Sequence, residues 1–434
     1  MTDRAEALGL IEFIDASPSP FHACAEAAAR LETGGFRRAT ETDVWAGGPG
    51  RGYVVRGGTL VAWVVPEVAA GRPETPFRLI GAHTDSPNLR IKPQPDTGRA
   101  GVQQLAVEVY GGVLLNSWLD RDLGLSGRVL VRGDDGGIET RLLLIDRPML
   151  RVPQLASHLD RDVNVKGLLL NPQQHLDPLW ACGEPEPGAF ARFLAKELAV
   201  DERSVLSWDV MAHDLSPSTL LGRDDDFLSA PRIDNLCSTY AAVRALTEAG
   251  MTEAGMTDAV AVAVLFDHEE VGSETATGAA SPILSTVLER LVLARGGDRQ
   301  AFHRALAGST CVSADGAHAT HPNFTDRHEP GHWIALNGGP VIKTNVNAHY
   351  ATDASTAAGF ARACDAAGVP VQRYVHRNDM KCGTTIGPIT AARLGIPVVD
   401  VGAPQLAMHS ARELTGALDP GYLVRALTAF LAAG

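Results

Sequence analysis

The sequence predicts an α/β fold, in which a mostly parallel mixed sheet is flanked by helices and a β-rich domain is inserted. Three observations support this prediction. From about residue 230 onward, strand-like and helical patterns alternate, which is typical of α/β domains. The run VAVAVLFD (260–267) is apolar throughout, as expected of a strand covered on both faces. From about residue 91 to 228, short β-like pieces alternate with turn residues, which indicates antiparallel strands.

The N-terminal segment begins the α/β domain. A helical pattern over residues 3–33 is interrupted by the sequence SPSP at 17–20. Strands are expected at 52–58 and 59–67, which form a hairpin, and at 77–85, in the centre of the sheet.

The rest of the α/β domain runs to the C-terminus. A chain of 434 residues is long for one hydrophobic core, so we expect residues 1–90 and 229–434 to form one discontinuous domain, with residues 91–228 inserted. Within the insert, residues 158–164 and 171–188 are expected to be long loops. The second segment of the α/β domain, residues 229–434, is predicted to contain both helices and strands. The helices are expected at 235–250, 281–294, 354–368 and 421–434, and the strands at 260–267, 310–315, 371–377 and 396–402.

Composition narrows the classes of function. The net charge is −13 and no basic block is present, which argues against a nucleic-acid partner. No apolar run approaches the ~20 residues of a membrane helix, and the N-terminus does not have the pattern of a signal peptide. The six cysteines are scattered without a CxxC pair, which suits a reducing cytoplasm and argues against disulfides or a thiolate zinc site.

Imidazoles and carboxylates follow the predicted strands and begin one predicted helix. In open α/β sheets, ligands bind beyond the carboxyl ends of the strands, so these side chains are expected to converge. Taken singly, each of these features has a simpler interpretation. A lone HxD is more often a surface turn, and an EE pair is more often a solvated helix start. Asp234 alone would be an N-cap, and His409 alone would be a surface histidine. The residues at such positions are His83, Asp85, Asp234, His268, Glu269, Glu270, Asp315, His318, His321 and His409.

This set of residue types predicts a metal site. Imidazoles and carboxylates without a thiol suit zinc above all, with manganese or cobalt possible. Two ions about 3.5–4 Å apart need a bridging carboxylate and further ligands for each ion. Five residues meet that need in number, which leaves Glu269 as a general base: His83, Asp234, Glu270, Asp315 and His409.

Seven motifs, in order and over nearly the whole chain, resemble the M18 family of metalloaminopeptidases, the aspartyl aminopeptidases. They are HTDSPNLRIKP (83–93), SAPRIDNLCSTYAA (229–242), FDHEEVGSETATGA (266–279), SADGAHATHPNF (313–324), GPVIKTN (339–345), NDMKCGTTIGPITAARLG (378–395) and PQLAMHSARE (404–413).

The resemblance implies roles for the predicted metal residues. His83 and Asp315 would hold one zinc, Glu270 and His409 a second, and Asp234 would bridge both. Asp85 would orient His83 through its second ring nitrogen. Glu269 would take a proton from the attacking water and hand it to the leaving amine.

The resemblance also implies substrate contacts. Lys343 would face the first side chain of the peptide and favour Asp or Glu there by charge pairing. His318 would stabilise the developing oxyanion, although packing of its loop is an equal alternative. Gly383 and Thr384 would contact the free amine of the substrate. Lys381 stands where the animal form of this motif usually has a proline, which puts the outer contacts of the pocket in doubt.

The inserted domain resembles the part of the family that builds subunit contacts. His158 matches a histidine that is lent to the active site of a neighbouring subunit, and its alternative is a loop residue without a catalytic part. The family assembles into hollow tetrahedral dodecamers that admit peptides. The resemblance therefore implies a homo-oligomer, a dodecamer, acting on peptide substrates.

Together with the residue patterns, this resemblance implies a cytoplasmic zinc metalloaminopeptidase that removes N-terminal residues, Asp or Glu by preference. A member of the same family that prefers apolar residues, or a related two-metal deacylase, is the alternative, because fold alone does not separate these activities. A catalytically silent protein that keeps the fold is a further alternative, against which stands the presence of every ligand and of Glu269.

Overall fold

The computed structural model describes residues 3–249 and 258–433, and the chain divides into two compact units. Unit 1 comprises Met1–Asp85, Ser218–Met408 and Glu413–Gly434. Unit 2 comprises Ser86–Pro217 and the short segment His409–Arg412. The sequence places the junctions at 90 and 228, whereas the two units divide at Asp85 and Pro217. The assignment of residues 409–412 to unit 2 was not anticipated.

Unit 1 is built on a nine-stranded mixed sheet, as the predicted α/β class requires. Its central strands β13, β4, β14 and β18 run parallel, while β3 joins β13, and β16 joins β18, in antiparallel fashion. The strand order is β1-β2-β3-β13-β4-β14-β18-β16-β17. The strands are β1 (Arg37–Arg38), β2 (Gly50–Arg56), β3 (Thr59–Val65), β4 (Phe77–His83), β13 (Val260–Phe266), β14 (Thr310–Ala314), β16 (Val341–Thr344), β17 (Gln372–Val375) and β18 (Val398–Gly402).

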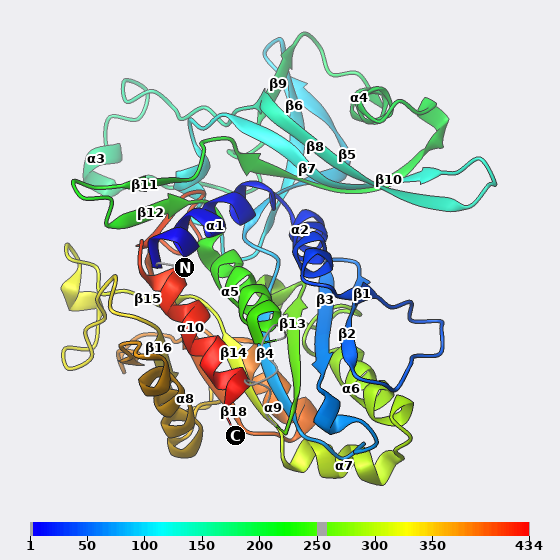
Figure 1. Ribbon diagram of the computed structural model, residues 1–434. Coiled ribbons are helices and arrows are strands. Elements are labelled where there is room, and N and C mark those ends of the chain that lie inside the picture. The colour runs from blue at the N-terminus through cyan, green and yellow to red at the C-terminus, as the bar shows by residue number, and fades with distance from the viewer. Residues whose placement is uncertain (1–2, 250–257, 434) are drawn as a thin grey trace. The chain divides into compact units, whose positions relative to one another are not determined.

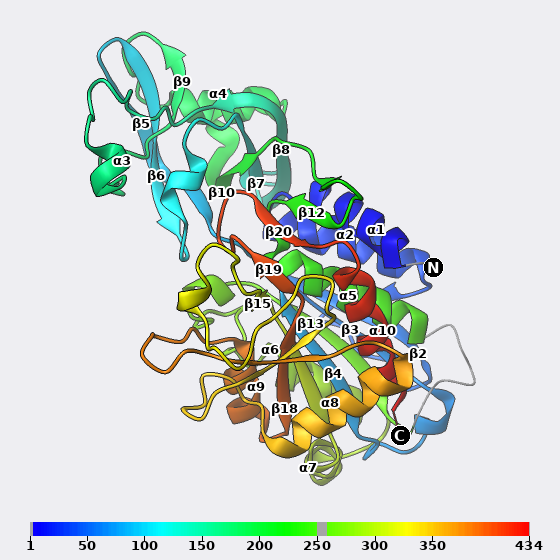
Figure 2. The same cartoon turned by 90° about the vertical axis from the view of Figure 1, so that its left-hand side faces the viewer.

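Alternation of side chains along the buried strands supplies two cores. In β13, Val262 and Val264 belong to one core, whereas Ala261 and Ala263 belong to the other, and all are buried. The alanine face receives helices α1 (Asp3–Asp15), α2 (Pro20–Thr33), α5 (Ile233–Ala249), α8 (Ala354–Ala367) and α10 (Asp419–Ala432). The valine face receives α6 (Ile283–Ala294), α7 (Arg299–Ala307) and α9 (Ile386–Leu394), as Figures 1 and 2 show.

A second sheet in unit 1 was not predicted. It has five strands in the order β11-β12-β20-β19-β15. Each strand has only two to four residues, which is too short for alternation to be recognised in the sequence. The strands are β11 (Thr219–Leu221), β12 (Phe227–Ala230), β15 (Ala317–His318), β19 (Pro404–Leu406) and β20 (Glu413–Gly416).

Unit 2 is the predicted β-rich module. Its six strands pair antiparallel throughout, in the order β8-β7-β10-β5-β6-β9. Phe190 packs edge-on against Trp208 at 5.3 Å between ring centroids and anchors α4 to the sheet. The elements are β5 (Asn88–Arg99), β6 (Val102–Tyr110), β7 (Leu123–Arg132), β8 (Ile138–Leu150), α3 (Val163–Lys166), β9 (Leu179–Cys182), α4 (Ala189–Glu197) and β10 (Val205–Asp214).

Several elements depart from the sequence-based expectations. The expected loop 171–188 contains β9, and the expected loop 158–164 runs into the short helix α3. Helices α4, α7 and α9 were not predicted. The ends of two expected helices, at Gly250 and Gly434, lie outside the described residues. Among the described residues, no helix combines the length and the apolar character needed to cross a membrane.

Candidate metal centre

Four elements of unit 1 bring polar side chains to one edge of its main sheet. β4 ends at His83, and Asp85 follows it. β13 ends at Phe266 and leads into a short 3₁₀ turn that carries Glu269 and Glu270. β14 ends one residue before Asp315, and α5 carries Asp234 near its start. Because the central strands are parallel, their carboxyl ends lie at the same edge, as predicted.

His83 lies at the centre of these groups. Its Nδ1 atom lies 3.0 Å from the main-chain oxygen of Asp85, a contact in which the ring N–H donates to the carbonyl. The Nε2 atom lies 3.3 Å from Asp234 Oδ1 and 3.4 Å from Asp315 Oδ1. Because the Nδ1 proton is engaged by the Asp85 carbonyl, Nε2 is the ring atom that faces the two carboxylates.

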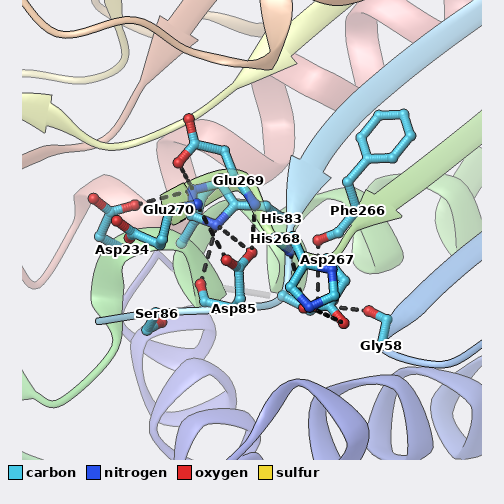
Figure 3. Close-up of polar contacts among 12 residues, drawn as sticks. Gly58, His83, Asp85, Ser86, Asp234, Phe266, Asp267, His268, Glu269 and Glu270 are labelled. Atoms are coloured by element: carbon cyan, nitrogen blue, oxygen red, sulfur yellow. Dashed lines mark hydrogen bonds and ion pairs between the residues drawn. The ribbon is translucent and has the colours of Figure 1, made fainter. Parts of the chain in front are cut away.

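Asp85 fixes the turn that carries the adjacent glutamates. Its Oδ1 accepts a hydrogen bond of 3.1 Å from the backbone N–H of Glu269, and its Oδ2 accepts one of 3.1 Å from the N–H of Glu270. Asp85 Oδ1 also lies 3.4 Å from His83 Nδ1. One fully buried carboxylate thus links the ends of β4 and β13, and Figure 3 shows it among these residues.

Asp234 does not act as a simple helix N-cap. Its backbone (φ −80°, ψ 105°) is not helical, although it lies within the span of α5. Its N–H donates to Glu413 Oε2 at 2.9 Å. The following residue, Asn235, donates its side-chain N–H to the main-chain oxygen of Ala314 at 2.8 Å. These two contacts hold Asp234 beside the end of β14, with its carboxylate directed at His83.

The charges at this site favour a cation. Burial alone would lower the pKa of His83, but its contacts with Asp234, Asp315 and Asp85 raise that pKa well above its usual value. One ligand atom each from His83, Asp234 and Asp315 lies within 4.8 Å of the others, and all three residues are buried. One imidazole and two carboxylates are suitable ligands for zinc. These residues therefore fit the predicted metal in ligand type and spacing.

Glu269 lies at the edge of the same group. Its Oε2 atom is 4.0 Å from His83 Nε2. Burial raises the pKa of Glu269 to about 8, His83 opposes that shift, and the carboxylates of Asp315, Asp85 and Asp234 reinforce it. One ligand atom each from His83, Glu269 and Glu270 also lies within 4.8 Å of the others. The adjacent glutamates thus lie beside the imidazole that the three aspartates surround.

His409 lies in the short segment His409–Arg412, which belongs to unit 2. Its Nδ1 atom lies 2.9 Å from the main-chain oxygen of Gly112, so the ring N–H at Nδ1 donates to that carbonyl. The lone pair of the neutral ring is then on Nε2, the arrangement found in histidines that bind metals. His409 therefore has the tautomer that its predicted role requires.

Lys343 is buried in β16, next to the end of β14. Its Nζ atom donates to the main-chain oxygens of Gly316 at 3.0 Å and Asp315 at 3.4 Å. It also lies 3.8 Å from Asp315 Oδ2 and 5.1 Å from the centre of the Tyr350 ring. The predicted specificity residue therefore lies beside a candidate metal ligand and contacts its backbone.

The remaining predicted substrate residues are exposed. Although its ring reaches solvent, desolvation by the surrounding protein and the Lys343 charge lower the pKa of His318 to about 4. Thr384 donates its hydroxyl to the main-chain oxygen of His349 at 3.1 Å, and Gly383 precedes it in the same exposed loop. His158 is exposed in unit 2, in the turn before α3.

Sequence reasoning missed two carboxylates that support this region. Glu413 is buried and holds the backbone of Asp234. Asp400 is buried at β18 and accepts hydrogen bonds from Thr385 Oγ1 and from the Ala351 N–H, both at 2.6 Å. For Asp400, the available signal was a lone acid in the apolar strand PVVDVG, since a buried acid needs partners, whereas the polar sequence RELTG carried no such signal for Glu413.

Comparison with known proteins agrees with the resemblance of the motifs. Residues 13–431 match a family model described as "Aminopeptidase I zinc metalloprotease (M18)". The chain is 53% identical over 430 residues to "Probable M18 family aminopeptidase 2" of Streptomyces coelicolor, covering 99% of this chain and 98% of that protein. It is 54% identical over 433 residues to the protein of the same name in Mycobacterium tuberculosis, with the same coverage.

Solved structures give the same result. The chain is similar to one from the complex of Ape4 and Nbr1, with a TM-score of 0.95, 34% identity, and coverage of 99% of this chain and 86% of that one. Yeast aminopeptidase 1 (Ape1) gives a TM-score of 0.85 at 29% identity, with coverage of 99% and 97%. A structure of the S. cerevisiae mApe1 dodecamer gives a TM-score of 0.85 at 28% identity, with coverage of 98% and 96%.

Proposed function

Since the chain belongs to the M18 family of zinc metalloaminopeptidases, we propose that it removes N-terminal Asp or Glu residues from peptides with the help of two metal ions. The observation that carries this proposal is the convergence of His83, Asp234 and Asp315 beside Glu269 at one sheet edge. Membership in the family makes the chain a metalloaminopeptidase. The number of ions, the role of each residue and the acidic preference are the proposal.

We assign the two ions as follows. His83 and Asp315 would hold the first, Glu270 and His409 would hold the second, and Asp234 would serve both. The proximity of His83, Asp234 and Asp315 supports the first set, and the tautomer of His409 supports its part in the second. When bound, the ions supply Lewis-acid polarisation of the scissile carbonyl and acidify the attacking water.

The protein's own residues then guide the proton. Glu269 accepts the proton of the attacking water and donates it to the amine nitrogen that leaves. Asp85 keeps Glu269 in place through the backbone N–H and keeps the N–H of His83 at Nδ1, so that Nε2 remains available as a ligand. His318 lies near Lys343 and stabilises the oxyanion by donating a hydrogen bond from its neutral ring.

The acidic preference rests on Lys343. Its ammonium is buried, so a carboxylate brought close to it would interact in a medium of low dielectric constant. Gly383 and Thr384, in the loop before α9, bind the free amine of the substrate. A preference for apolar N-terminal residues is the second candidate, because the contacts of Lys343 with the Asp315 and Gly316 carbonyls also suit a structural lysine.

We propose that the protein works as a homo-oligomer, a dodecamer, in the cytoplasm. The solved mApe1 dodecamer supports the assembly, and unit 2 is the part proposed to build its contacts. His158 is proposed to enter the active site of a neighbouring subunit. None of the six cysteines forms a disulfide in the described structure, which is compatible with a reducing compartment.

An assay of aminoacyl para-nitroanilides, with and without chelator, tests this proposal. We expect Asp and Glu substrates to be cleaved faster than Leu and Ala substrates, and chelator to abolish all cleavage. Faster cleavage of Leu would support the apolar alternative. Cleavage that survives complete removal of metal would contradict the metal mechanism itself.

Metal analysis tests the assignment of the two ions. We expect two zinc ions per wild-type chain and about one in His409→Ala, because that histidine belongs to the second set only. Thr384→Ala serves as a control, since Thr384 is proposed to bind substrate and not metal. A His409→Ala variant that retains two ions would refute this assignment.

A further inference from the structure

Unit 1 contains a second pocket, formed where the connection from β1 to β2 curls over β2 and β3. Its volume is about 630 Å³, within the range of about 300–1,000 Å³ typical of small-molecule sites. The sheet edge that bears it is drawn at β1 and β2 in Figure 1. Within the nine-stranded sheet, β13 and β3 stand between β4, which ends at His83, and this edge.

The open side of this pocket carries three arginines. Arg37 and Arg38 are exposed, and Arg51 is half-buried. Arg51 Nη1 donates to the main-chain oxygen of Gly34 at 2.6 Å. Within the described part of the chain, none of the three has a carboxylate within ion-pair distance, and Asp43 is the one acid in the lining. This cluster stands out in a chain whose net charge is −13.

The inner side of the pocket is apolar and rigid. Trp63, Val65 and Leu291 are buried beneath it. The Trp45 ring stacks on Trp63 with 5.0 Å between centroids and an interplanar angle of 23°. Arg290 packs on Trp45 at 3.9 Å from the ring centre. Both ends of the indole pair are therefore fixed against the sheet and α6.

The loop over the pocket is held in place by hydrogen bonds from Trp45 and Arg290. Trp45 Nε1 donates to the main-chain oxygen of Thr40 at 3.0 Å. Arg290 Nη1 donates to the main-chain oxygen of Glu41 at 2.6 Å, and its Nη2 donates to that of Asp43. A ligand would consequently meet a preformed wall, which lowers the entropic cost of binding.

We propose that this pocket binds a small organic phosphate of the nucleoside diphosphate class. Guanidinium groups bind phosphate oxygens through paired hydrogen bonds. Arg37 and Arg38 have no acidic partner in residues 3–249 and 258–433 and leave that capacity available, whereas Arg51 already donates from Nη1 to Gly34 and has its other nitrogens left to donate. The apolar floor of Trp63, Val65 and Leu291 contacts the ring of the ligand, while Arg37, Arg38 and Arg51 contact its phosphates. Nothing in the peptidase reaction requires this pocket, so the binding is a separate property of the chain.

Calorimetry on the zinc-loaded protein, with ADP as the probe and no added divalent cation, tests this proposal. We expect wild type to bind ADP, and the Arg37→Ala/Arg38→Ala variant to bind at least about tenfold more weakly, because two charge-assisted contacts are lost. Arg299→Ala/Arg304→Ala on α7 removes the same charge elsewhere and should bind as wild type does. Peptidase activity should be the same in all three proteins, which also shows that they are folded.

Four results would overturn the proposal. ADP that does not bind wild type, or that binds the Arg37→Ala/Arg38→Ala variant equally well, would show that this pocket is not the site. If inorganic phosphate bound as tightly as ADP, the apolar floor of the pocket would make no contact with the ring of the ligand. As a second measurement, ADP should quench the fluorescence of wild type and have a smaller effect on Trp45→Phe. Equal quenching in both proteins would contradict binding at this pocket.

Discussion

Glu269 and Glu270 are adjacent in sequence, and their two carboxylates repel each other. A few individual contacts hold them in place despite this repulsion. The backbone N–H groups of both residues bind one buried carboxylate, Asp85, so their main-chain positions are fixed by β4. On their other side lies His83, whose Nε2 atom is 4.0 Å from Glu269 Oε2. A cation among these groups would offset the repulsion between the carboxylates.

The Glu269→Gln variant tests the role of this residue as the base. Gln has the same shape but cannot accept the proton of the attacking water, so kcat should fall by about 10²–10⁴-fold. Zinc content, measured by mass spectrometry, should remain that of wild type. The exposed Glu274→Gln, on the same connection, should be fully active. A Glu269→Gln variant with near-normal kcat would exclude the residue as base.

Lys343→Leu separates a specificity role from a structural role. If Lys343 pairs with the substrate, kcat/KM for Asp and Glu substrates should fall by about tenfold or more, equivalent to about 1.4 kcal/mol. The kcat/KM for Leu substrates should rise, since the apolar side chain of the variant replaces a charged one in the pocket. Zinc content decides the alternative, because Lys343 also contacts the backbone of Asp315. Equal loss on all substrates, together with loss of zinc, would mean that Lys343 supports the metal site.

For single residues, the sequence predicted the candidate metal ligands better than the residues that hold those ligands in place. His83, Asp234 and Asp315 were expected to converge, and their ligand atoms lie within 4.8 Å of one another. Glu413 was not assigned a role, because its partner, the Asp234 N–H, is remote in the chain and becomes a neighbour only through folding.

Among elements, strand β18 has a role beyond the sheet. Its residue Asp400 accepts hydrogen bonds from Thr385, the N-cap of α9, and from the Ala351 N–H. Its own N–H donates to Thr352 Oγ1 at 2.9 Å. Burial raises the pKa of Asp400, and the Lys343 charge opposes that shift. One carboxylate thus connects the loop before α8 with the loop that carries Gly383 and Thr384.

Asp400→Ala should therefore loosen the proposed substrate pocket. Each buried group left without its acceptor, the Ala351 N–H and the Thr385 hydroxyl, costs about 1–3 kcal/mol of folding free energy. We expect KM to rise by roughly tenfold, with a smaller change in kcat. Asp400→Asn keeps a carbonyl oxygen and should recover most of the loss. Asp365→Asn, exposed on α8, is the control. A selective fall in kcat would contradict a positioning role.

The elements that the sequence missed were missed for different reasons. α9 begins with IGP, and both Gly and Pro usually indicate a turn, yet Pro is well tolerated in the first turn of a helix. α7 did have end signals, since Asp298 accepts from the Ala301 N–H and Gly308 follows the last turn. The five-stranded sheet of unit 1 had none, because its strands have only two to four residues and two of its pairs, β12 with β20 and β15 with β19, join residues far apart in the chain. Long, apolar strands such as β13 were predicted because both of their faces are buried.

At the scale of the whole molecule, the division into two units bears on how the chain is proposed to assemble into an oligomer. The chain was predicted to have a discontinuous α/β domain and a β-rich insertion, and each unit has a hydrophobic core of its own. Which surface unit 2 offers to another subunit cannot be inferred from periodicity, because it depends on residues that a single chain leaves exposed. His158 is one such residue.

The final prediction concerns whether active sites are shared between subunits. His158→Ala alone and Glu269→Gln alone should each be nearly inactive, and light scattering should show the wild-type assembly for both. Co-expressed in one assembly, they should regain activity, because an intact Glu269 can meet an intact His158 from a neighbour. With random mixing, roughly a quarter of the sites would have both residues. If His158 acted within its own subunit, mixing would restore nothing, since no single chain would carry both groups. If His158 had no part in the reaction, His158→Ala alone would be as active as wild type.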